Sequence, residues 1–324
     1  MIAIAIRKLA YYFLGAVKKI LKICLRLLRK RKGKHINRLM TKLAIIRVRI
    51  DFIRRGRLKF TFQPDDIFIV TYPRSGTALM RMILFQLTTD GSMEFEHISQ
   101  FIPFYDRLLR TGQNPEMLSS PRVFVTHFRY KWLPKGDCKY IYVARDGRDA
   151  MVSHFHFRAY TGLGYTKTFS QFFNQFMKTG NLYGTWFDHM AEWWSHRGDA
   201  NILFLTYEAL RRDLAGCIRQ VADFLRIEIE PGRFPKILER CSFAFMKENQ
   251  DRFDVRKEYL APPKPYSTDF IRKGQVGEWK EYLSPDQQLR FEKKFQRRLG
   301  GLGLSLNGIH EGIGGTGVPE NKEP

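Results

Sequence analysis

Short hydrophobic runs alternate with helical patterns through the middle of the chain. Runs rich in β-branched and aromatic residues occupy 67–70, 122–127 and 139–144, and a further strand-to-helix junction lies at 202–208. Runs of this kind are typical of strands buried on both faces of a sheet. Because they alternate with amphipathic segments such as 211–225, the pattern predicts an α/β fold with a mostly parallel central sheet flanked by helices.

The first run leads into a loop that has the features of an anion site. Tyr-Pro-Arg-Ser-Gly-Thr at 72–77 breaks the run, and apolar residues recur at helical spacing from Ala78. The first amides of a helix have no internal partner and carry partial positive charge, so a strand, a tight loop and a helix favour a bound anion. The loop adds a guanidinium, two hydroxyls and a glycine that lets the backbone approach closely: Arg74, Ser75, Thr77 and Gly76.

One other interpretation of this loop stays open and another is excluded. It could be a plain strand-to-helix connection, since short motifs also occur by chance. A nucleoside-triphosphate loop of the G-x-x-x-x-G-K-[ST] type is excluded, because its glycine spacing and lysine are absent.

Positive charge is concentrated at the N-terminal end of the chain. The whole chain has 55 Lys and Arg against 32 Asp and Glu, a formal net charge of +23. Residues 1–60 contain 19 of the basic residues and a single acid, Asp51, so about +18 lies there and only about +5 in the remainder. The mildly basic body does not indicate a specific nucleic-acid partner.

The N-terminal arm, residues 1–34, has an amphipathic pattern. On a helix at about 100° per residue, basic residues occupy one sector and apolar residues the other. The basic sector comprises Arg7, Lys8, Lys18, Lys19, Lys22, Arg26, Arg29 and Lys30, and the apolar sector Ile6, Leu9, Ala10, Phe13, Leu14, Val17, Ile20, Leu21, Leu27 and Leu28. This pattern predicts a helix lying on an anionic membrane surface, with packing on protein as the alternative. The longest uncharged run, 9–17, is far shorter than the ~20 residues that a spanning helix needs.

Composition divides the chain into four predicted segments. These are the amphipathic arm at 1–34, a basic connecting segment at 35–62, a globular domain at 63–299 and a glycine-rich tail at 300–324 that we expect to be disordered. The four cysteines are widely spaced, which predicts neither a zinc site nor a disulfide framework and fits a reducing compartment: Cys24, Cys138, Cys217 and Cys241.

Residues with useful chemistry follow two of the predicted strands. His127 ends the run at 122–127, and ligands of α/β proteins bind at the carboxyl ends of strands, although a lone histidine is more often structural. An unperturbed histidine titrates near the operating pH of a general base. Arg145 follows the run at 139–144, and Ser153 lies eight residues later, so the two could hold one anion from two sides.

Taken in order, these segments resemble the sulfotransferase family. TYPRSGTAL at 71–79 is similar to the family's TYPKSGTTW, VTHF at 125–128 to K-T-H-[LF], YVARDGRDAMVSHFHF at 142–157 to YVARNxxDxxVSxYHF, and RKGQVGEWK at 272–280 to RKGxxGDWK. Further matches are GTWFDHMAEWW at 184–194, LTYEAL at 205–210 and CSFAFM at 241–246.

The resemblance implies transfer of a sulfuryl group from 3′-phosphoadenylyl sulfate (PAPS) to an acceptor hydroxyl or amine, with PAP as product and no metal. It makes His127 the general base and Arg74 the group that stabilises charge on the leaving nucleotide. It assigns the 5′-phosphosulfate to Arg74, Ser75, Gly76 and Thr77, the 3′-phosphate to Arg145, Ser153, Arg272, Lys273 and Gly274, and the adenosine to Tyr207, Ser242 and Phe243. The aromatic residues of 184–194 are expected mainly to pack, with a further role beside the acceptor left open.

The chain departs from the family pattern at four positions. Arg74 replaces a lysine, Ala78 a threonine, Leu79 the adenine-stacking tryptophan and Val125 a second lysine. The change at Val125 places more of the charge stabilisation on Arg74 and leaves the effect on turnover open.

These observations together predict a cytoplasmic PAPS-dependent enzyme, attached peripherally to a membrane through its arm, with a small-molecule or lipid-linked acceptor. A nucleotide kinase is one alternative, but its lysine and magnesium-binding carboxylate cannot be placed. A non-catalytic membrane adaptor on a sulfotransferase-like fold is another, and the absence of lysine at Val125 and tryptophan at Leu79 slightly favours it. The acceptor and the oligomeric state stay open.

Overall fold

The computed structural model describes residues 62–111, 118–133, 136–161, 168–259 and 269–311, together with Val17, Lys19, Ile20 and Ile23. Most of the predicted arm and connecting segment therefore lies outside the described residues. None of the described helices is long and apolar enough to cross a membrane.

The chain divides into two compact units, of which one is 1–62 with 105–118 and the other 63–104 with 119–324. In the first unit, α4 (Tyr105–Thr111) begins at Tyr105, whose ring lies 6.0 Å from the ring of Phe62. The second unit contains the sheet and every site residue that the sequence predicted.

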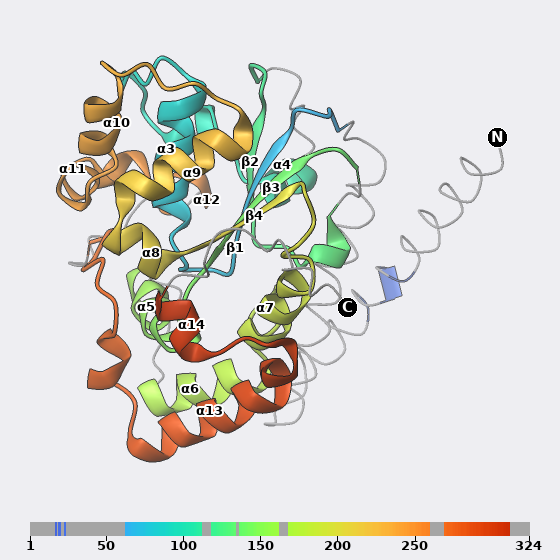
Figure 1. Ribbon diagram of the computed structural model, residues 1–324. Coiled ribbons are helices and arrows are strands. Elements are labelled where there is room, and N and C mark those ends of the chain that lie inside the picture. Colours follow the sequence, from blue (N-terminus) through green and yellow to red (C-terminus); the bar gives the residue numbers. More distant parts are fainter. Residues whose placement is uncertain are drawn as a thin grey trace, which may run out of the picture. The chain divides into compact units, whose positions relative to one another are not determined.

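Four parallel strands form the sheet of the second unit, as the hydrophobic runs predicted. They are β1 (Ile67–Thr71), β2 (Val123–Thr126), β3 (Lys139–Ala144) and β4 (Ile202–Thr206), in the order β2-β1-β3-β4 (Figure 1). The chain passes from β1 to β2 at one edge and then crosses β1 to reach β3. The boundary between β1 and β3 is therefore the topological switch point, where α/β folds bind ligands.

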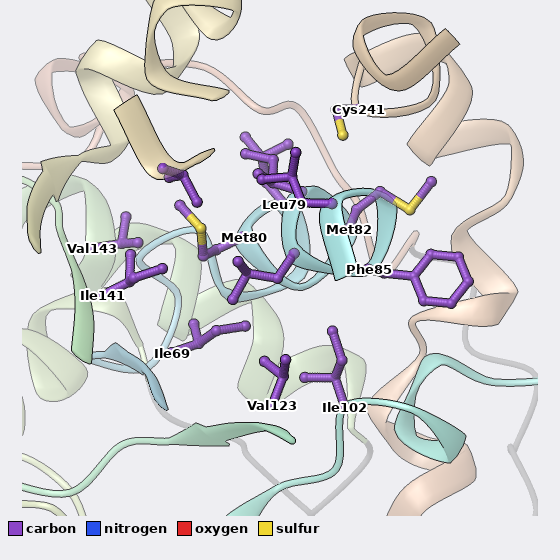
Figure 2. Close-up of a cluster of buried hydrophobic side chains, with 14 of the residues drawn as sticks. Ile69, Leu79, Met80, Met82, Phe85, Ile102, Val123, Ile141, Val143 and Cys241 are labelled. Carbon is purple, nitrogen blue, oxygen red and sulfur yellow. The ribbon is translucent and has the colours of Figure 1, made fainter. Parts of the chain in front are cut away.

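One face of the sheet is aliphatic and packs on helices. Ile69 of β1 is in register with Val125 and Ile141 of its neighbours, and all three belong to one buried cluster. Figure 2 shows Ile69 and Ile141 within this cluster. The cluster also takes in the apolar side of α3 (Thr77–Thr88) and of α9 (Leu214–Leu225). This packing accounts for the aliphatic residues on this side of the strand runs.

The opposite face of the sheet is aromatic. The ring of Phe68 lies 5.3 Å from Phe124 and 5.5 Å from Tyr140 on the adjacent strands. The ring of Tyr142 is stacked on Trp193 at 5.4 Å, which joins this face to α7 (Trp186–Trp194). Helix α7 therefore lies against the sheet opposite to α3.

The other helices of this unit are α5 (Gly147–Tyr160), α6 (Phe169–Lys178), α8 (Tyr207–Arg212), α10 (Phe234–Arg240), α11 (Phe243–Glu248), α12 (Val255–Tyr259), α13 (Pro285–Leu299) and α14 (Leu306–Glu311). The prediction of one helix over 211–225 is wrong at its start. Asp213 ends α8, and its carboxylate accepts the N–H of Gly216 at 2.8 Å, so the chain turns there and begins α9.

The prediction of disorder beyond Leu299 is wrong for 300–311. A 3₁₀ turn at Gly300–Leu302 precedes α14, and Trp194 donates its indole N–H to the carbonyl of Leu302 at 2.8 Å. Leu304 and Ile309 are buried, so this segment has an apolar anchor that its glycine content concealed. Residues 312–324 lie outside the described part of the chain.

Candidate active site

Several of the predicted site residues directly follow the carboxyl ends of the four strands. The loop 72–76 follows β1, His127 follows β2, Arg145 follows β3 and Tyr207 follows β4. Because the strands are parallel, these positions meet at one edge of the sheet. A cavity at that edge is lined by all the predicted site residues except Ser75 and Ser242, namely Arg74, Gly76, Thr77, His127, Arg145, Ser153, Tyr207, Phe243, Arg272, Lys273 and Gly274.

The loop between β1 and α3 leads into a helix whose first amides have no intrahelical partner. Within the loop, the N–H of Ser75 donates to the carbonyl of Tyr72 at 3.1 Å. Arg74 and Gly76 have φ angles of 73° and 97°, and a Cβ atom at Gly76 would lie 2.9 Å from the ring of Tyr207. Gly76 begins α3 without a side-chain cap and without an acid in the first turn. Ser75 Oγ is buried and has no hydrogen-bond partner within the described residues. Open amides and an unpartnered hydroxyl at a helix N-terminus fit a bound anion.

Arg74 reaches from this loop to α5. Its Nε donates to Ser153 Oγ at 3.2 Å and its Nη2 to the carbonyl of Phe270 at 3.4 Å, while the guanidinium lies over the rings of Phe157 and Phe270 at 4.8 and 5.4 Å. Burial, helped by the charge of Arg145, lowers the pKa of Arg74 to about 10. Arg74 therefore stays charged at neutral pH and connects the predicted 5′-phosphosulfate loop with a predicted 3′-phosphate residue.

His127 is held in one tautomer by the end of β1. Its Nδ1 lies 2.8 Å from the carbonyl oxygen of Thr71, which can only accept, so the proton is on Nδ1 and the lone pair on Nε2. Burial, followed by the charges of Arg74 and Arg81, lowers the pKa of His127 to about 4 against the opposing effect of the Thr71 carbonyl. The expectation of an ordinary histidine pKa is therefore wrong, because this ring is buried beside cations.

Arg145 is a buried cation held by neutral groups. Its Nη1 donates to the carbonyl of Arg74 at 3.0 Å and its Nη2 to that of Gln275 at 2.9 Å, and its guanidinium lies 4.3 Å from the ring centre of Tyr207. Its Nε is buried without a hydrogen-bond partner, and it forms no ion pair within the described residues. A buried cation of this kind favours an anionic ligand.

The loop before Trp279 carries its own counterion. Glu278 lies 2.7 Å from Arg272 Nη1 and 3.0 Å from Lys273 Nζ. Burial alone would raise the pKa of Glu278, but hydrogen bonds from these two cations lower it to about 2. Arg272 and Lys273 line the cavity as predicted, and Glu278 fixes both side chains there.

Asp149 attaches this loop to α5, a role that the sequence analysis did not assign. Its carboxylate accepts the backbone N–H groups of Gly277 at 2.7 Å and of Trp279 at 3.0 Å. Desolvation raises the pKa of Asp149. The aspartate of the YVARNxxD pattern falls at Asp149, so the resemblance contained a signal for it. Asp149 and Arg145, four residues apart on the chain, both bind the backbone of this loop, Arg145 at Gln275 and Asp149 at Gly277 and Trp279.

A second glycine, Gly274 of the predicted 3′-phosphate set, lies against the ring of Phe243 of the predicted adenosine set. Gly274 has a φ of 63°, and a Cβ atom there would lie 2.5 Å from the ring of Phe243, so no other residue fits without a shift of that ring. Ser242 is not in the cavity wall, because its Oγ accepts the N–H of Phe245 at 3.2 Å and caps α11. Ser242 therefore acts on the cavity only through α11, the helix that it caps and that begins at Phe243.

The cavity also has a cation that the sequence analysis missed. Arg81 of α3 lines it, is 2% exposed, and donates Nε to the carbonyl of Ile102 at 3.1 Å. Its guanidinium lies 5.1 Å from the ring centre of Phe104, whose ring lies 5.4 Å from that of His127. No sequence pattern distinguishes Arg81 from an exposed arginine on a helix, because Arg81 is buried only by the packing of α3.

Cations, open helix amides and an apolar wall at one cavity fit a nucleotide that carries several phosphate or sulfate groups. No group of metal-binding side chains occurs within the described residues. A family model described as a sulfotransferase domain matches residues 64–303. The chain belongs to the sulfotransferase family.

Individual sulfotransferases are similar to it over most of their length. Human Sulfotransferase 1C2 is 32% identical over 261 residues, which are 76% of this chain and 87% of that protein. A mouse structure, SULT7A1 complexed with PAP, is 30% identical with a TM-score of 0.59 and covers 76% of this chain and 87% of the other. A structure of retinol dehydratase in complex with androsterone and PAP is 25% identical, with a TM-score of 0.67 and coverage of 76% and 83%.

This sulfotransferase accordingly uses PAPS as its sulfuryl donor, and its relatives support that activity over a nucleotide kinase or a non-catalytic adaptor. The individual residue roles assigned from the motifs remain predictions.

Proposed function

We propose that this sulfotransferase transfers the sulfuryl group of PAPS to the hydroxyl or amine of a small apolar acceptor, with His127 as general base. One observation carries the proposal. The Nδ1–H of His127 is engaged by the Thr71 carbonyl, which leaves Nε2 as a proton acceptor in a cavity that also contains Arg74 and Arg145.

The proposed chemistry needs only one proton transfer to the protein. The acceptor oxygen forms a bond to sulfur as the bond from sulfur to the leaving nucleotide oxygen breaks, and the acceptor proton moves to His127 Nε2. Arg74 stabilises the negative charge that develops on the leaving oxygen, which is the usual electrostatic role of such a group. Arg145, with Ser153, Arg272, Lys273 and Gly274, would hold the 3′-phosphate, while Tyr207 and Phe243 would hold the adenosine.

The apolar class of acceptor is supported by apolar side chains in the cavity wall. Phe104, Phe253 and Val255 line the cavity, and the ring of Phe104 lies 5.4 Å from that of His127. A wall of this composition favours an apolar molecule with a single polar group. The structure of retinol dehydratase, a similar protein, contains androsterone, an apolar molecule, together with PAP.

We further propose that residues 1–34 attach this cytoplasmic enzyme peripherally to an anionic membrane surface, where a lipid-linked acceptor would be within reach. Ile20 and Ile23 support this, since both are in helical conformation and are 59% and 58% exposed. The charge of about +18 in residues 1–60 would add electrostatic attraction to anionic lipid.

The test is transfer of radiolabelled sulfate from PAPS into a panel of apolar alcohols, amines and a membrane lipid extract. We expect label in an extractable acceptor with the parent protein and none above background with His127→Ala. PAP binding by both proteins without transfer to any acceptor would support the adaptor instead.

A further inference from the structure

Helix α7 presents three ring nitrogens on a single face. Trp186, His189 and Trp193 are separated by three and four residues, so their side chains project from the same side of the helix. All three rings are buried, with exposures of 1%, 0% and 0%. Packing alone would account for the size of these three side chains, but it does not account for the hydrogen-bond partners of their N–H groups.

Each of these N–H groups meets a backbone carbonyl just beyond the end of a strand. Trp186 Nε1 donates to the carbonyl of Arg145 at 3.1 Å, after β3. His189 Nε2 lies 3.1 Å from the carbonyl of His127, and Trp193 Nε1 donates to that of Phe128 at 3.1 Å, both after β2. These carbonyls lie beyond the sheet ladder, so a buried donor must come from elsewhere in the fold.

Tyr142 fixes the proton on His189. The Tyr142 hydroxyl lies 3.0 Å from His189 Nδ1, and the carbonyl of His127 can only accept, so the proton of the ring is on Nε2 and Tyr142 donates to Nδ1. Burial lowers the pKa of His189 to about 3, so the ring is neutral near neutral pH and keeps this arrangement.

We propose that Trp186, His189 and Trp193 are positioning residues through which α7 aligns the base with the 3′-phosphate arginine. The inference rests on the proposed roles of His127 and Arg145. β2 and β3 are not neighbours, because β1 lies between them, so the sheet ladder does not couple their ends directly. One rigid helix that donates to both ends sets their separation, and small errors of placement are costly in catalysis.

One of the three hydrogen bonds supports nucleotide binding and the other two support the general base, and the experiment measures these two effects separately. Trp186 acts on the nucleotide side, so Trp186→Phe should weaken PAP binding about 3- to 10-fold, as expected for one lost hydrogen bond, with kcat changed less than about twofold. Trp193→Phe and His189→Phe act on the base, so they should lower kcat about 3- to 10-fold and leave the Kd of PAP nearly unchanged.

The same helix offers a matched control and a rescue. Trp194 is also buried and donates its N–H to a backbone carbonyl, that of Leu302, which is not in the cavity wall. Trp194→Phe should therefore change neither PAP binding nor kcat, although it removes the same group. His189→Gln should recover most of the kcat lost in His189→Phe, because its amide can donate to His127 and accept from Tyr142.

A titration gives a readout that does not depend on activity. The imidazole of His127 is assigned by comparison with a His127→Gln spectrum, and its pKa is measured by NMR in the parent and in His189→Phe. The proposal expects a shift toward 6.5 in the variant, because a displaced ring becomes hydrated. Trp194→Phe should leave the titration unchanged.

Two outcomes overturn the inference. One is an equal effect of Trp186→Phe and Trp194→Phe on PAP binding, and the other is an unshifted His127 titration in His189→Phe. Failure of the parent protein to bind PAP or to transfer sulfate would instead overturn the proposed function, and the titration would still decide whether α7 positions His127.

Discussion

The Nδ1 atom of His127 lies 2.8 Å from the carbonyl oxygen of Thr71. Thr71, the last residue of β1, therefore fixes the tautomer of His127, which follows the adjacent strand β2. β1 and β2 are in parallel register through the pair Val70 and Thr126, which brings the two groups together. The contact orients Nε2 as the acceptor and makes the chemistry of the site dependent on the sheet. It also means that the proposed role of His127 in proton transfer is separate from nucleotide binding, which other residues carry out.

The first prediction follows from that separation. His127→Ala should leave the Kd of PAP within about twofold, because no proposed nucleotide contact involves the ring. Its turnover should fall on the order of 10²–10⁴-fold, the usual effect of removing a general base. Calorimetry with PAP and a single-turnover sulfate-transfer assay measure the two effects, and comparable turnover of variant and parent would rule out the assignment.

The pH dependence of kcat/KM should show a broad plateau. His127 is active only when neutral and its pKa is lowered to about 4, so activity is lost as the pH falls toward 4 rather than through 6.5. Arg74 is active only when charged and its pKa is lowered to about 10, so activity is lost as the pH rises toward 10. Rates measured between pH 4.5 and 9 check this, and an acidic limb near 6.5 would mean that His127 is hydrated in the free enzyme.

A third prediction concerns recognition of the 3′-phosphate. Arg145→Ala should weaken PAP binding by about 1.5–3 kcal/mol, the usual effect of losing a hydrogen bond to a charged partner. Affinity for adenosine 5′-phosphosulfate, which lacks the 3′-phosphate, should change little. Arg219→Ala is the control, since Arg219 lies over Phe234 at 4.1 Å and does not line the cavity. Equal weakening for both nucleotides would assign Arg145 to folding instead.

The attachment of the 270–280 loop should depend on Asp149. Asp149→Ala removes the acceptor of two backbone N–H groups, those of Gly277 and Trp279, and should lower the free energy of unfolding by about 1–3 kcal/mol. PAP binding should weaken as well, because Arg272 and Lys273 are on the same loop. Chemical denaturation and calorimetry measure the two effects, and unchanged PAP binding in a destabilised variant would show that the loop is placed by other contacts.

The last prediction concerns the N-terminal arm. The full-length protein should sediment with anionic vesicles at low salt and be released only in part as salt rises, because exposed charges are screened beyond about 8 Å at physiological ionic strength whereas apolar contacts are not. Deletion of residues 1–34 should abolish sedimentation and preserve PAP binding, since every matched motif lies after residue 67.

A charge-matched variant separates insertion from electrostatic adhesion. Replacement of Phe13, Leu14, Leu21 and Leu28 by serine keeps the net charge and should abolish vesicle binding. Undiminished binding by this variant would place the apolar face against protein, and a membrane-linked acceptor would no longer be expected.

The strands and the loop after β1 were predictable because their signals are local. A run such as 67–70 followed by proline and glycine determines its own conformation over a few residues, and parallel pairing follows once such runs alternate with helices. The break at Asp213 and the helix at Leu306–Glu311 were missed for the converse reason. One depends on a single capping carboxylate, and the other on an anchor contact with Trp194 from more than a hundred residues away.

The sequence by itself determined which chemical groups stand at the ends of the strands: Arg74, His127, Arg145 and Tyr207 each follow a predicted run. Only the tertiary structure decided how those groups behave. The contact of Arg74 with Ser153 joins residues 79 apart, and that of Asp149 with Gly277 joins residues 128 apart. The pKa of His127 depends on burial by segments that its own neighbourhood does not specify. Local sequence determines periodicity and turn chemistry, whereas desolvation and hydrogen-bond partners arise only when distant segments exclude water together.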